Sequence, residues 1–249
     1  LKEVFLPSPK FRCFSYTGNN HGTNTTQAYI NKRVMNENMV AYYKERAVEY
    51  EKIYSKPERQ KDIARLENML REIFAGKNLL EIACGTGYWT EKISRTASSI
   101  FATDINQSVI DIAKTKEYQA DVSFNVYDLI ELQPASAYEN LFAGFIWSHI
   151  KLQELDAFIR KVNSLVKPGG KLVFTDNNYV EGSSTAISEK DDFGNTFQLR
   201  KLADGSMHKV LKNFPSEDMI RNLLNGKAQQ IHFSRLEYYW ILAYQVPEN

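Results

Sequence analysis

Apolar and amphipathic segments alternate along the middle of the chain. Apolar runs with the length of buried strands cover residues 78–84, 99–104, 122–128, 141–148 and, after a turn, 167–177. Stretches with helical spacing lie between them, at residues 88–96, 106–118 and 151–166, and Asn106 is expected to cap the second of these helices. Apolar strands that alternate with helices are typical of a parallel sheet covered on both faces. The pattern therefore predicts a doubly wound α/β fold.

The last part of the chain predicts a change of architecture. Residues 196–212 place an Asp-Gly turn between two alternating runs, which is a hairpin signal. A helix is expected over residues 215–224, and two strands over residues 228–235 and 236–246, joined by a short link that favours an antiparallel pair. With the five earlier strands, this predicts a mostly parallel seven-stranded sheet with an antiparallel last strand and a hairpin insertion.

Two helices are expected before this sheet. Residues 39–55 form a tyrosine-rich helical pattern, and residues 57–74 form a second one with Pro57 in its first turn. Residues 1–34 are polar and show neither a helical nor a strand period, so we expect an arm or a disordered tail there.

The size of the chain fits a single domain. With 249 residues, of which 43% are hydrophobic, the chain is long enough to bury one full core. We expect this domain to cover residues 35–249, with lid helices at about residues 35–75 and an insertion on the substrate side at about residues 178–213.

Charge and cysteine content exclude several classes of protein. The 31 basic and 30 acidic residues give a net charge of +1 and are scattered, so neither a nucleic-acid partner nor a membrane surface is expected. The longest apolar run, residues 141–147, is too short to cross a bilayer. Two cysteines provide no disulfide framework and no leader pattern is visible, which favours a reducing, cytoplasmic compartment. The four histidines show no paired ligand spacing, so no metal is expected. The oligomeric state stays open.

The stretch "EIACGTG" joins the first strand of the sheet to a helix. Ligands of open parallel sheets bind near this turn, where glycine lets the backbone approach them closely. Asp104 ends the next strand, at a suitable place to accept hydrogen bonds from a ribose, which predicts an adenosine cofactor. Thr90 stands where a dinucleotide requires a third small residue. Glu81 would repel a pyrophosphate but hold an ammonium group, so NAD is disfavoured.

These residues resemble the class I S-adenosylmethionine (SAM)-dependent methyltransferases, whose first motif runs Asp/Glu-x-Gly-x-Gly-x-Gly. The stretch "EIACGTG" matches it, with Ala83 in place of the first glycine. The resemblance covers roughly residues 40–245. It implies a Rossmann-like methyltransferase fold, SAM as the cofactor and S-adenosylhomocysteine (SAH) as the product.

The same resemblance implies the cofactor contacts. Glu81 and the glycine turn hold the methionine part, Asp104 binds the ribose, and Asp128 with Leu129 meets the adenine. The other residues implied at the cofactor are Tyr42, Tyr43, Arg46, Ala83, Gly85, Gly87, Trp89 and Ile105. For Trp89, packing in the core is an equal alternative.

His149 is the candidate catalytic residue. It follows the apolar strand whose end faces the methyl group in the fold that this chain resembles, and histidine is suited to take a proton from a hydroxyl, carboxyl or amine. A hydrogen-bonded structural histidine is the alternative. The residues expected at the acceptor are Trp147, Asn177, Tyr179 and Arg200. Either Arg200 or His208 is a candidate contact for an anionic acceptor.

Three functions are compatible with these patterns. The first is a SAM-dependent methyltransferase that acts on a small-molecule acceptor at oxygen or nitrogen. The second is a subunit that binds SAM without catalysis, and the third is an RNA or protein methyltransferase. The sequence "WSHI" follows the fourth strand, where many enzymes that methylate planar nitrogens carry an Asn-Pro-Pro-Tyr-like tetrapeptide. This favours oxygen or aliphatic-type acceptors.

Overall fold

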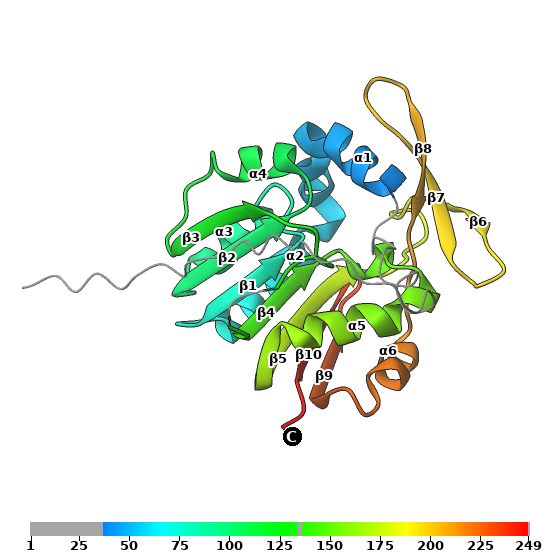
Figure 1. The fold of residues 1–249 in the computed structure, drawn as a ribbon. Helices are drawn as coiled ribbons and strands as arrows, with labels where there is room; N and C mark the ends of the chain where they lie inside the picture. The colour runs from blue at the N-terminus through cyan, green and yellow to red at the C-terminus, as the bar shows by residue number, and fades with distance from the viewer. Residues whose placement is uncertain (1–36, 134–135, 249) are drawn as a thin grey trace, which may run out of the picture.

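A computed structural model describes residues 37–133 and 136–248, so the prediction for residues 1–34 lies outside the described residues. Its centre is a seven-stranded sheet with the order β3-β2-β1-β4-β5-β10-β9 (Figure 1). The strands are β1 (Asn78–Ile82), β2 (Ser99–Asp104), β3 (Asp121–Val126), β4 (Tyr138–Gly144), β5 (Val166–Asn177), β9 (Gln229–Arg235) and β10 (Tyr239–Gln245). β10 pairs antiparallel with β5 and β9, and the other neighbours are parallel. The predicted mostly parallel sheet with an antiparallel last strand is confirmed.

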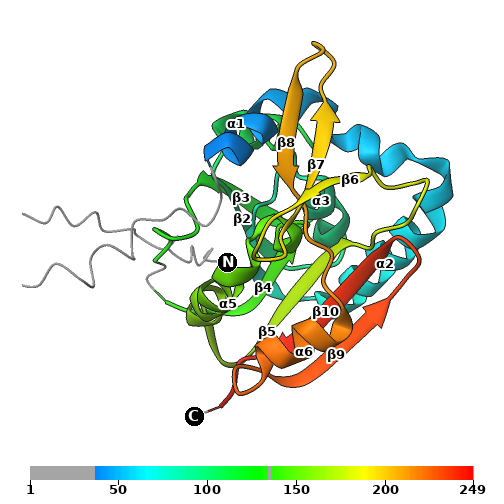
Figure 2. The same ribbon diagram turned by 90° about the vertical axis from the view of Figure 1, so that its right-hand side faces the viewer.

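Helices cover both faces of this sheet (Figure 2). On one face lie α2 (Gln60–Ile73), α3 (Tyr88–Ser94) and α4 (Gln107–Ala113), and on the other α5 (Leu155–Ser164) and α6 (Glu217–Leu224). Along β4, Phe142 belongs to the core with α2, whereas Leu141 and Ala143 belong to the core with α5. Because successive strand residues point to opposite faces, one continuous apolar run supplies both cores.

The strand order reverses beside β1. This strand pairs in parallel with β2 on one side and with β4 on the other. At such a switch point the loops that leave the carboxyl ends of the two strands run in opposite directions and leave a crevice between them. The loops after Ile82 and Gly144 therefore border the place where a ligand is expected.

A second, smaller sheet and the first described helix lie beyond the carboxyl edge of the main sheet (Figures 1 and 2). The elements are α1 (Glu37–Arg46), β6 (Ile187–Lys190), β7 (Thr196–Lys201) and β8 (Met207–Leu211). The predicted hairpin corresponds to β7 and β8, whereas β6 is a third strand that the sequence pattern did not predict. Tyr42 of α1 packs against Val210 and Leu211 of β8. The start of the described chain thus rests on the inserted sheet.

Two elements end earlier than their patterns predict. The helix expected over residues 39–55 is α-helical only as far as Arg46 and continues as the 3-10 helix η2 (Ala47–Ser55). The strand expected over residues 141–148 ends at Gly144, because Phe145 has a φ of 62° and leaves the extended region. The short helix η4 (Trp147–His149) follows it. Two further 3-10 helices, η3 (Pro57–Arg59) and η5 (Leu152–Glu154), precede α2 and α5.

Asn106 occupies the N-cap position of α4, as expected, but its side chain accepts no capping hydrogen bond. Instead, Asp104 Oδ1 accepts a hydrogen bond from the backbone N–H of Asn106 at 2.9 Å. The carboxylate at the end of β2 therefore organises the turn into α4. Throughout residues 37–133 and 136–248, no helix combines the length and the apolar character needed to cross a membrane.

Candidate active site

The turn between β1 and α3 adopts left-handed backbone conformations. Gly85 and Gly87 have φ values of 56° and 77°, and Ala83, which replaces the first glycine of the motif, has a φ of 53°. A Cβ on Gly87 would lie 2.5 Å from the Tyr118 hydroxyl and 3.0 Å from Cβ of Ala113. Position 87 thus requires glycine for two reasons. Residues with a side chain rarely adopt the left-handed conformation, and the close neighbours leave no room for a Cβ atom.

Replacing Gly87 with alanine is expected to lower the free energy of unfolding by about 2 to 3 kcal/mol, because backbone strain and a steric clash add. Gly76→Ala is the matched control, since Gly76 has a φ of 66° and a methyl group added there would have nothing within 4 Å. It is expected to cost only the strain, about 1 kcal/mol. Urea unfolding of both variants measures the difference, and equal losses would contradict the clash at Gly87.

A pocket opens above this turn, at the carboxyl ends of β1, β2 and β4. Seven of the residues that the sequence assigned to the cofactor line it: Tyr43, Ala83, Gly85, Asp104, Ile105, Asp128 and Leu129. Asp104 Oδ2 accepts a hydrogen bond from the backbone N–H of Gly85 at 3.0 Å, which ties the ends of β1 and β2 together. Burial raises the pKa of Asp104, although the backbone N–H groups of Asn106 and Gly85 oppose this. We call this space the cofactor pocket.

Glu81 lies in β1 below the turn and is only 2% exposed. Its Oε2 is buried and has no hydrogen-bond partner among the described residues. Burial raises the pKa of Glu81 to about 8, and the nearby Asp104 carboxylate adds to this, while the Thr90 hydroxyl opposes it. A buried carboxyl group with a free acceptor is costly unless a donor or a cation completes it. Glu81 thus fits a group that carries a positive charge.

A second cavity, of about 390 Å³, adjoins the cofactor pocket. Its lining comes mainly from α1, η2, β7 and the end of β5, and Lys212 lines it directly after β8. Tyr43, Tyr50, Phe145 and His149 line both spaces. Of the residues that the sequence assigned to the acceptor, Asn177 and Arg200 line this cavity. We call it the acceptor cavity, because it meets the cofactor pocket at a histidine.

Arg46 and Tyr42, which the sequence assigned to the cofactor, line the acceptor cavity rather than the cofactor pocket. Trp89 stacks on Phe145 with ring centroids 5.9 Å apart, and its Nε1–H donates to the Tyr54 hydroxyl at 3.2 Å. It is part of the core on that face. Trp89, Glu81 and Gly87 do not line the cofactor pocket.

Two residues that the sequence assigned to the acceptor lie elsewhere. Trp147 is 1% exposed and packs in the core against Phe174 and Trp240. The positive φ of Phe145 ends the strand alternation just before it, so the direction of the Trp147 side chain does not follow from the strand pattern. Tyr179 is 40% exposed and contacts Phe214 instead. Neither side chain lines the cavity.

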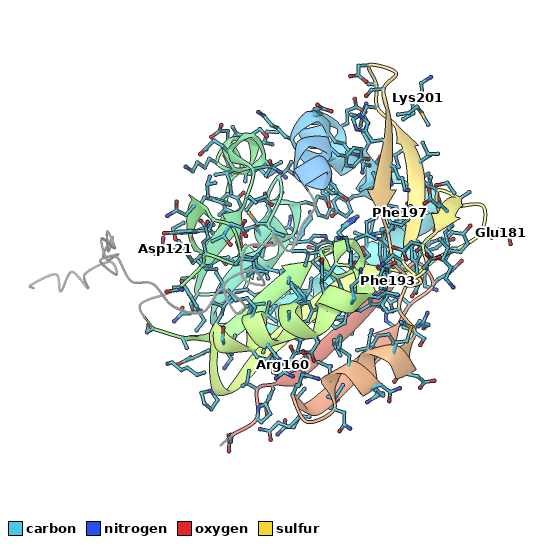
Figure 3. All side chains as sticks on the ribbon, turned by 45° about the vertical axis from the view of Figure 1, so that its right-hand side comes forward. Asp121, Arg160, Glu181, Phe193, Phe197 and Lys201 are labelled. Carbon is cyan, nitrogen blue, oxygen red and sulfur yellow. The ribbon has the colours of Figure 1, made fainter. Side chains whose placement is uncertain are left out.

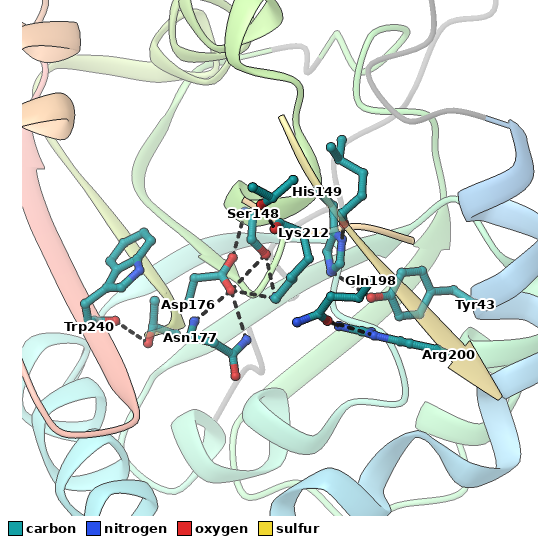
Figure 4. A network of polar contacts seen from close by, with 12 residues as sticks. Tyr43, Ser148, His149, Asp176, Asn177, Gln198, Arg200, Lys212 and Trp240 are labelled. Carbon is teal, nitrogen blue, oxygen red and sulfur yellow. Dashed lines mark hydrogen bonds and ion pairs between the residues drawn. The ribbon is translucent and has the colours of Figure 1, made fainter. Parts of the chain in front are cut away.

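His149 is held in one orientation by two hydrogen bonds (Figure 4). Its Nδ1 lies 2.6 Å from the carbonyl oxygen of Leu211. Since a carbonyl oxygen only accepts, Nδ1 carries the hydrogen and donates it. In the neutral ring Nε2 is then an acceptor, and it takes a hydrogen bond from the Tyr43 hydroxyl at 2.7 Å. Burial, reinforced by the charge of Lys212, holds the pKa of His149 well below its usual range, although Asp176 opposes this.

A buried ion pair lies beside this histidine (Figure 4). Lys212 Nζ lies 2.9 Å from Asp176 Oδ1 and donates to Ser148 Oγ at 2.6 Å. Asp176 is fully buried, and its two oxygens also accept from Ser148 N and Ser148 Oγ, each at 2.9 Å. Burial lowers the pKa of Lys212 to about 8, although Asp176 opposes this. For Asp176, burial acts to raise the pKa, but the Lys212 and His149 charges hold it below its ordinary value.

The sequence patterns did not single out Lys212 or Tyr50. Lys212 follows the apolar residues Val210 and Leu211 at the end of the hairpin, and a lysine directly after a buried pair is the available signal. Tyr50 lay within the predicted lid, with no pattern to separate it from the neighbouring tyrosines. No group of three His, Cys, Asp or Glu side chains suited to hold a metal ion occurs within the described part of the chain.

Comparison with known proteins agrees with this geometry. Residues 79–170 match the family described as methyltransferase domain. An uncharacterized methyltransferase of Bacillus mycoides is 21% identical over 183 residues, which cover 71% of this chain and 80% of the relative. A relative of Bacillus cereus has the same identity and coverage.

Solved structures share the fold. The complex of DhpI with SAH has a TM-score of 0.70 and 23% identity, covering 88% of this chain and 100% of that one. The complex of DhpI with SAM and HEP has a TM-score of 0.69 and 24% identity, covering 86% of this chain and 99% of that one. The PH0226 protein of Pyrococcus horikoshii OT3 has a TM-score of 0.64 and 18% identity, covering 80% and 98%.

The sheet order, the glycine turn and the pocket above it define a Rossmann-like fold with a ligand site at the first turn. Together with the methyltransferase domain matched over residues 79–170 and the related methyltransferases, they support the resemblance of this chain to the class I SAM-dependent methyltransferases.

Proposed function

We propose that this chain is a SAM-dependent methyltransferase that acts on a small-molecule acceptor at an oxygen or nitrogen atom, with His149 as the general base. The observation that carries this proposal is the position of His149 Nε2. It is an acceptor in the neutral ring and belongs to a side chain that lines both the cofactor pocket and the acceptor cavity. A base at this boundary reaches the proton of a group that approaches the cofactor from the cavity.

The size of the cavity supports a small acceptor. Its volume of about 390 Å³ is in the range of small-ligand sites. This favours a small molecule over RNA or a protein chain.

The residues of the cofactor pocket fit SAM. Bound SAM supplies a methyl group on a positively charged sulfur. Asp104 presents a carboxylate for the ribose hydroxyls, and Asp128 with Leu129 lines the adenine end. Glu81 lies in β1 below the turn and does not line this pocket, and its unpartnered Oε2 suits the ammonium group of the methionine part, whose charge would lower the raised pKa of this carboxyl group.

His149 and its neighbours then handle the acceptor proton. The acceptor hydroxyl or amine takes the place of the Tyr43 hydroxyl on Nε2 and gives its proton to that nitrogen. The Leu211 carbonyl keeps the ring oriented by accepting from Nδ1–H, and it also stabilises the imidazolium that forms. Because burial disfavours the charged ring, His149 returns the proton to water readily and is neutral for the next turnover.

Cofactor binding tests the first half of this proposal. We expect calorimetry to show SAH binding with a free energy of about 7 to 9 kcal/mol, the micromolar range. Asp104→Ala is expected to weaken it by about 1.5 to 3 kcal/mol, because the charged acceptor for the ribose hydroxyls is lost. Asp111→Ala is the matched control, since Asp111 is exposed on α4 and bonds only Gln107 among the described residues. An Asp104→Ala protein that is folded and binds SAH like the wild type would contradict this assignment.

A further inference from the structure

The acceptor cavity is strongly basic, although the whole chain has a net charge of only +1. Seven cationic side chains and one acidic side chain, Glu49, line it. The cationic residues are Arg46, Lys52, Lys56, Arg59, Arg200, Lys201 and Lys212. A concave site with one sign of charge raises the local concentration of ligands of the opposite sign. The charge distribution thus points to an anionic ligand.

Four of these cations, Arg46, Arg59, Arg200 and Lys201, have no acidic side chain within 4 Å among the described residues. Arg71, Arg95, Arg160 and Arg221 each form an ion pair with a glutamate or an aspartate on the surface. Neither Arg46 nor Arg200 has an acidic partner within 4 Å among the described residues. Their charges are therefore available to a ligand in the cavity.

Arg46 is held with an unused donor. Its guanidinium lies over the rings of Tyr42 and Tyr50, 5.7 and 5.6 Å from their centroids. Its Nη1 is buried and has no hydrogen-bond partner among the described residues. A buried donor without an acceptor costs free energy, and the cost is larger for a charged group. A ligand oxygen that accepts from this nitrogen would remove the cost.

Arg200 is positioned from the opposite element, β7. Its Nε and Nη2 donate to Gln198 Oε1 at 3.2 and 2.7 Å, which fixes the guanidinium plane beside Tyr43 (Figure 4). Its charge acts on His149, where it contributes to the lowered pKa, so it lies close to the proposed base. A guanidinium held in this way binds carboxylate or phosphate oxygens with defined geometry.

We infer that the methyl acceptor carries an oxyanion, of carboxylate or phosphate type, which binds to Arg46 and Arg200. This inference rests on the proposed function and names the substrate class of the same site. The atom to be methylated lies a few bonds from the anionic group, so that it reaches His149 Nε2 while the two guanidinium groups hold the oxyanion. Lys212 contributes less, because Asp176 already offsets its charge.

Calorimetry on the SAH-saturated protein tests the anion site with two probes, inorganic phosphate and acetate. We expect at least one of them to bind, and the tighter one indicates the type of oxyanion. Arg46→Gln and Arg200→Gln should each weaken that binding about tenfold or more, because a charge-assisted pair is lost. Arg160→Gln is the matched control, since Arg160 is exposed on α5, does not line the cavity and is paired with Asp156 (Figure 3).

Turnover provides a second readout. Hydroxy acids and phosphate monoesters should be methylated at least tenfold faster than their neutral methyl esters or amides, with SAH release as the assay. If neither anion binds, if both arginine variants bind anions like the wild type, or if neutral acceptors react as fast, the inference is overturned. The anion titrations are repeated without SAH. If the protein fails to bind SAH but still binds the anion, the result counts against the proposed function alone.

Discussion

Replacing His149 with alanine is expected to lower turnover about 100-fold or more, while SAH affinity stays within about twofold of the wild type. The reason is that a general base acts on the acceptor proton in the transition state and does not hold the cofactor. Initial rates with an acceptor found in the screen of hydroxy acids and phosphate monoesters measure the change. His232→Ala is the matched control, because His232 is an exposed residue of β9 away from both cavities.

The pH profile adds an independent readout. The pKa of His149 lies below its ordinary value, so the base stays unprotonated at neutral pH. The acid limb of kcat/KM should therefore fall below pH 6.5, the ordinary histidine value. Burial raises the pKa of Tyr43, which makes this hydroxyl unsuited to accept a proton as tyrosinate, so Tyr43→Phe should lower turnover only a few-fold.

Normal turnover of the His149→Ala protein would reject the base role. If Tyr43→Phe loses as much activity as His149→Ala, the proton acceptor would be reassigned. A wild-type protein that binds SAH but methylates nothing in a broad screen would instead favour a subunit that binds SAM without catalysis.

The second large effect concerns stability. Asp176→Ala is expected to lower the free energy of unfolding by about 3 to 5 kcal/mol, because it leaves the buried ammonium of Lys212 without its counter-charge. It also removes the acceptor for Ser148 N and Ser148 Oγ. Urea unfolding at pH 7, below the lowered pKa of Lys212 of about 8, keeps that group largely charged in the folded protein.

The double variant Asp176→Asn with Lys212→Met is the control for this prediction. It removes both charges while keeping side chains of similar size, and replacing a buried pair in this way is often close to neutral for stability. The double variant should therefore be clearly more stable than Asp176→Ala. If Asp176→Ala costs less than about 1 kcal/mol, the pair would behave like an exposed one, and the burial argument would be wrong.

The main sheet was predictable because its signals are local. Apolar runs, separated by helices and turns, define β1, β2, β4 and β5, polar and apolar residues alternate along β3, and the Asp-Gly turn identifies β7 and β8. The residues of β6 are all exposed, so there is no alternation of buried and exposed positions that would predict this strand. β4 ends at Gly144 because of the backbone conformation of Phe145. The apolar run continues through Phe145 without a break, so the sequence pattern does not show this end.

The cofactor pocket could be predicted from the sequence because it forms around the turn after β1. The acceptor cavity was less predictable, because it forms where segments far apart in the chain meet. Asp104, Gly85 and Asp128 follow strands of the main sheet, so their common location follows from the fold. The position of Arg46 in the acceptor cavity depends on how α1 packs on β8, a contact between segments far apart in the chain. Sequence spacing contains no information on such packing, and Lys212 was missed for the same reason.

Tyr43 and Tyr50 line the cofactor pocket and the acceptor cavity at once, and both belong to the short N-terminal segment α1 to η2. Whatever occupies one space therefore orders side chains that the other occupant needs. We expect the two binding equilibria to be coupled, and linkage makes this coupling reciprocal: the factor by which SAH tightens the acceptor equals the factor by which the acceptor tightens SAH. The acceptor concentration that half-saturates the enzyme is then set by the supply of cofactor as well as by the acceptor's own contacts.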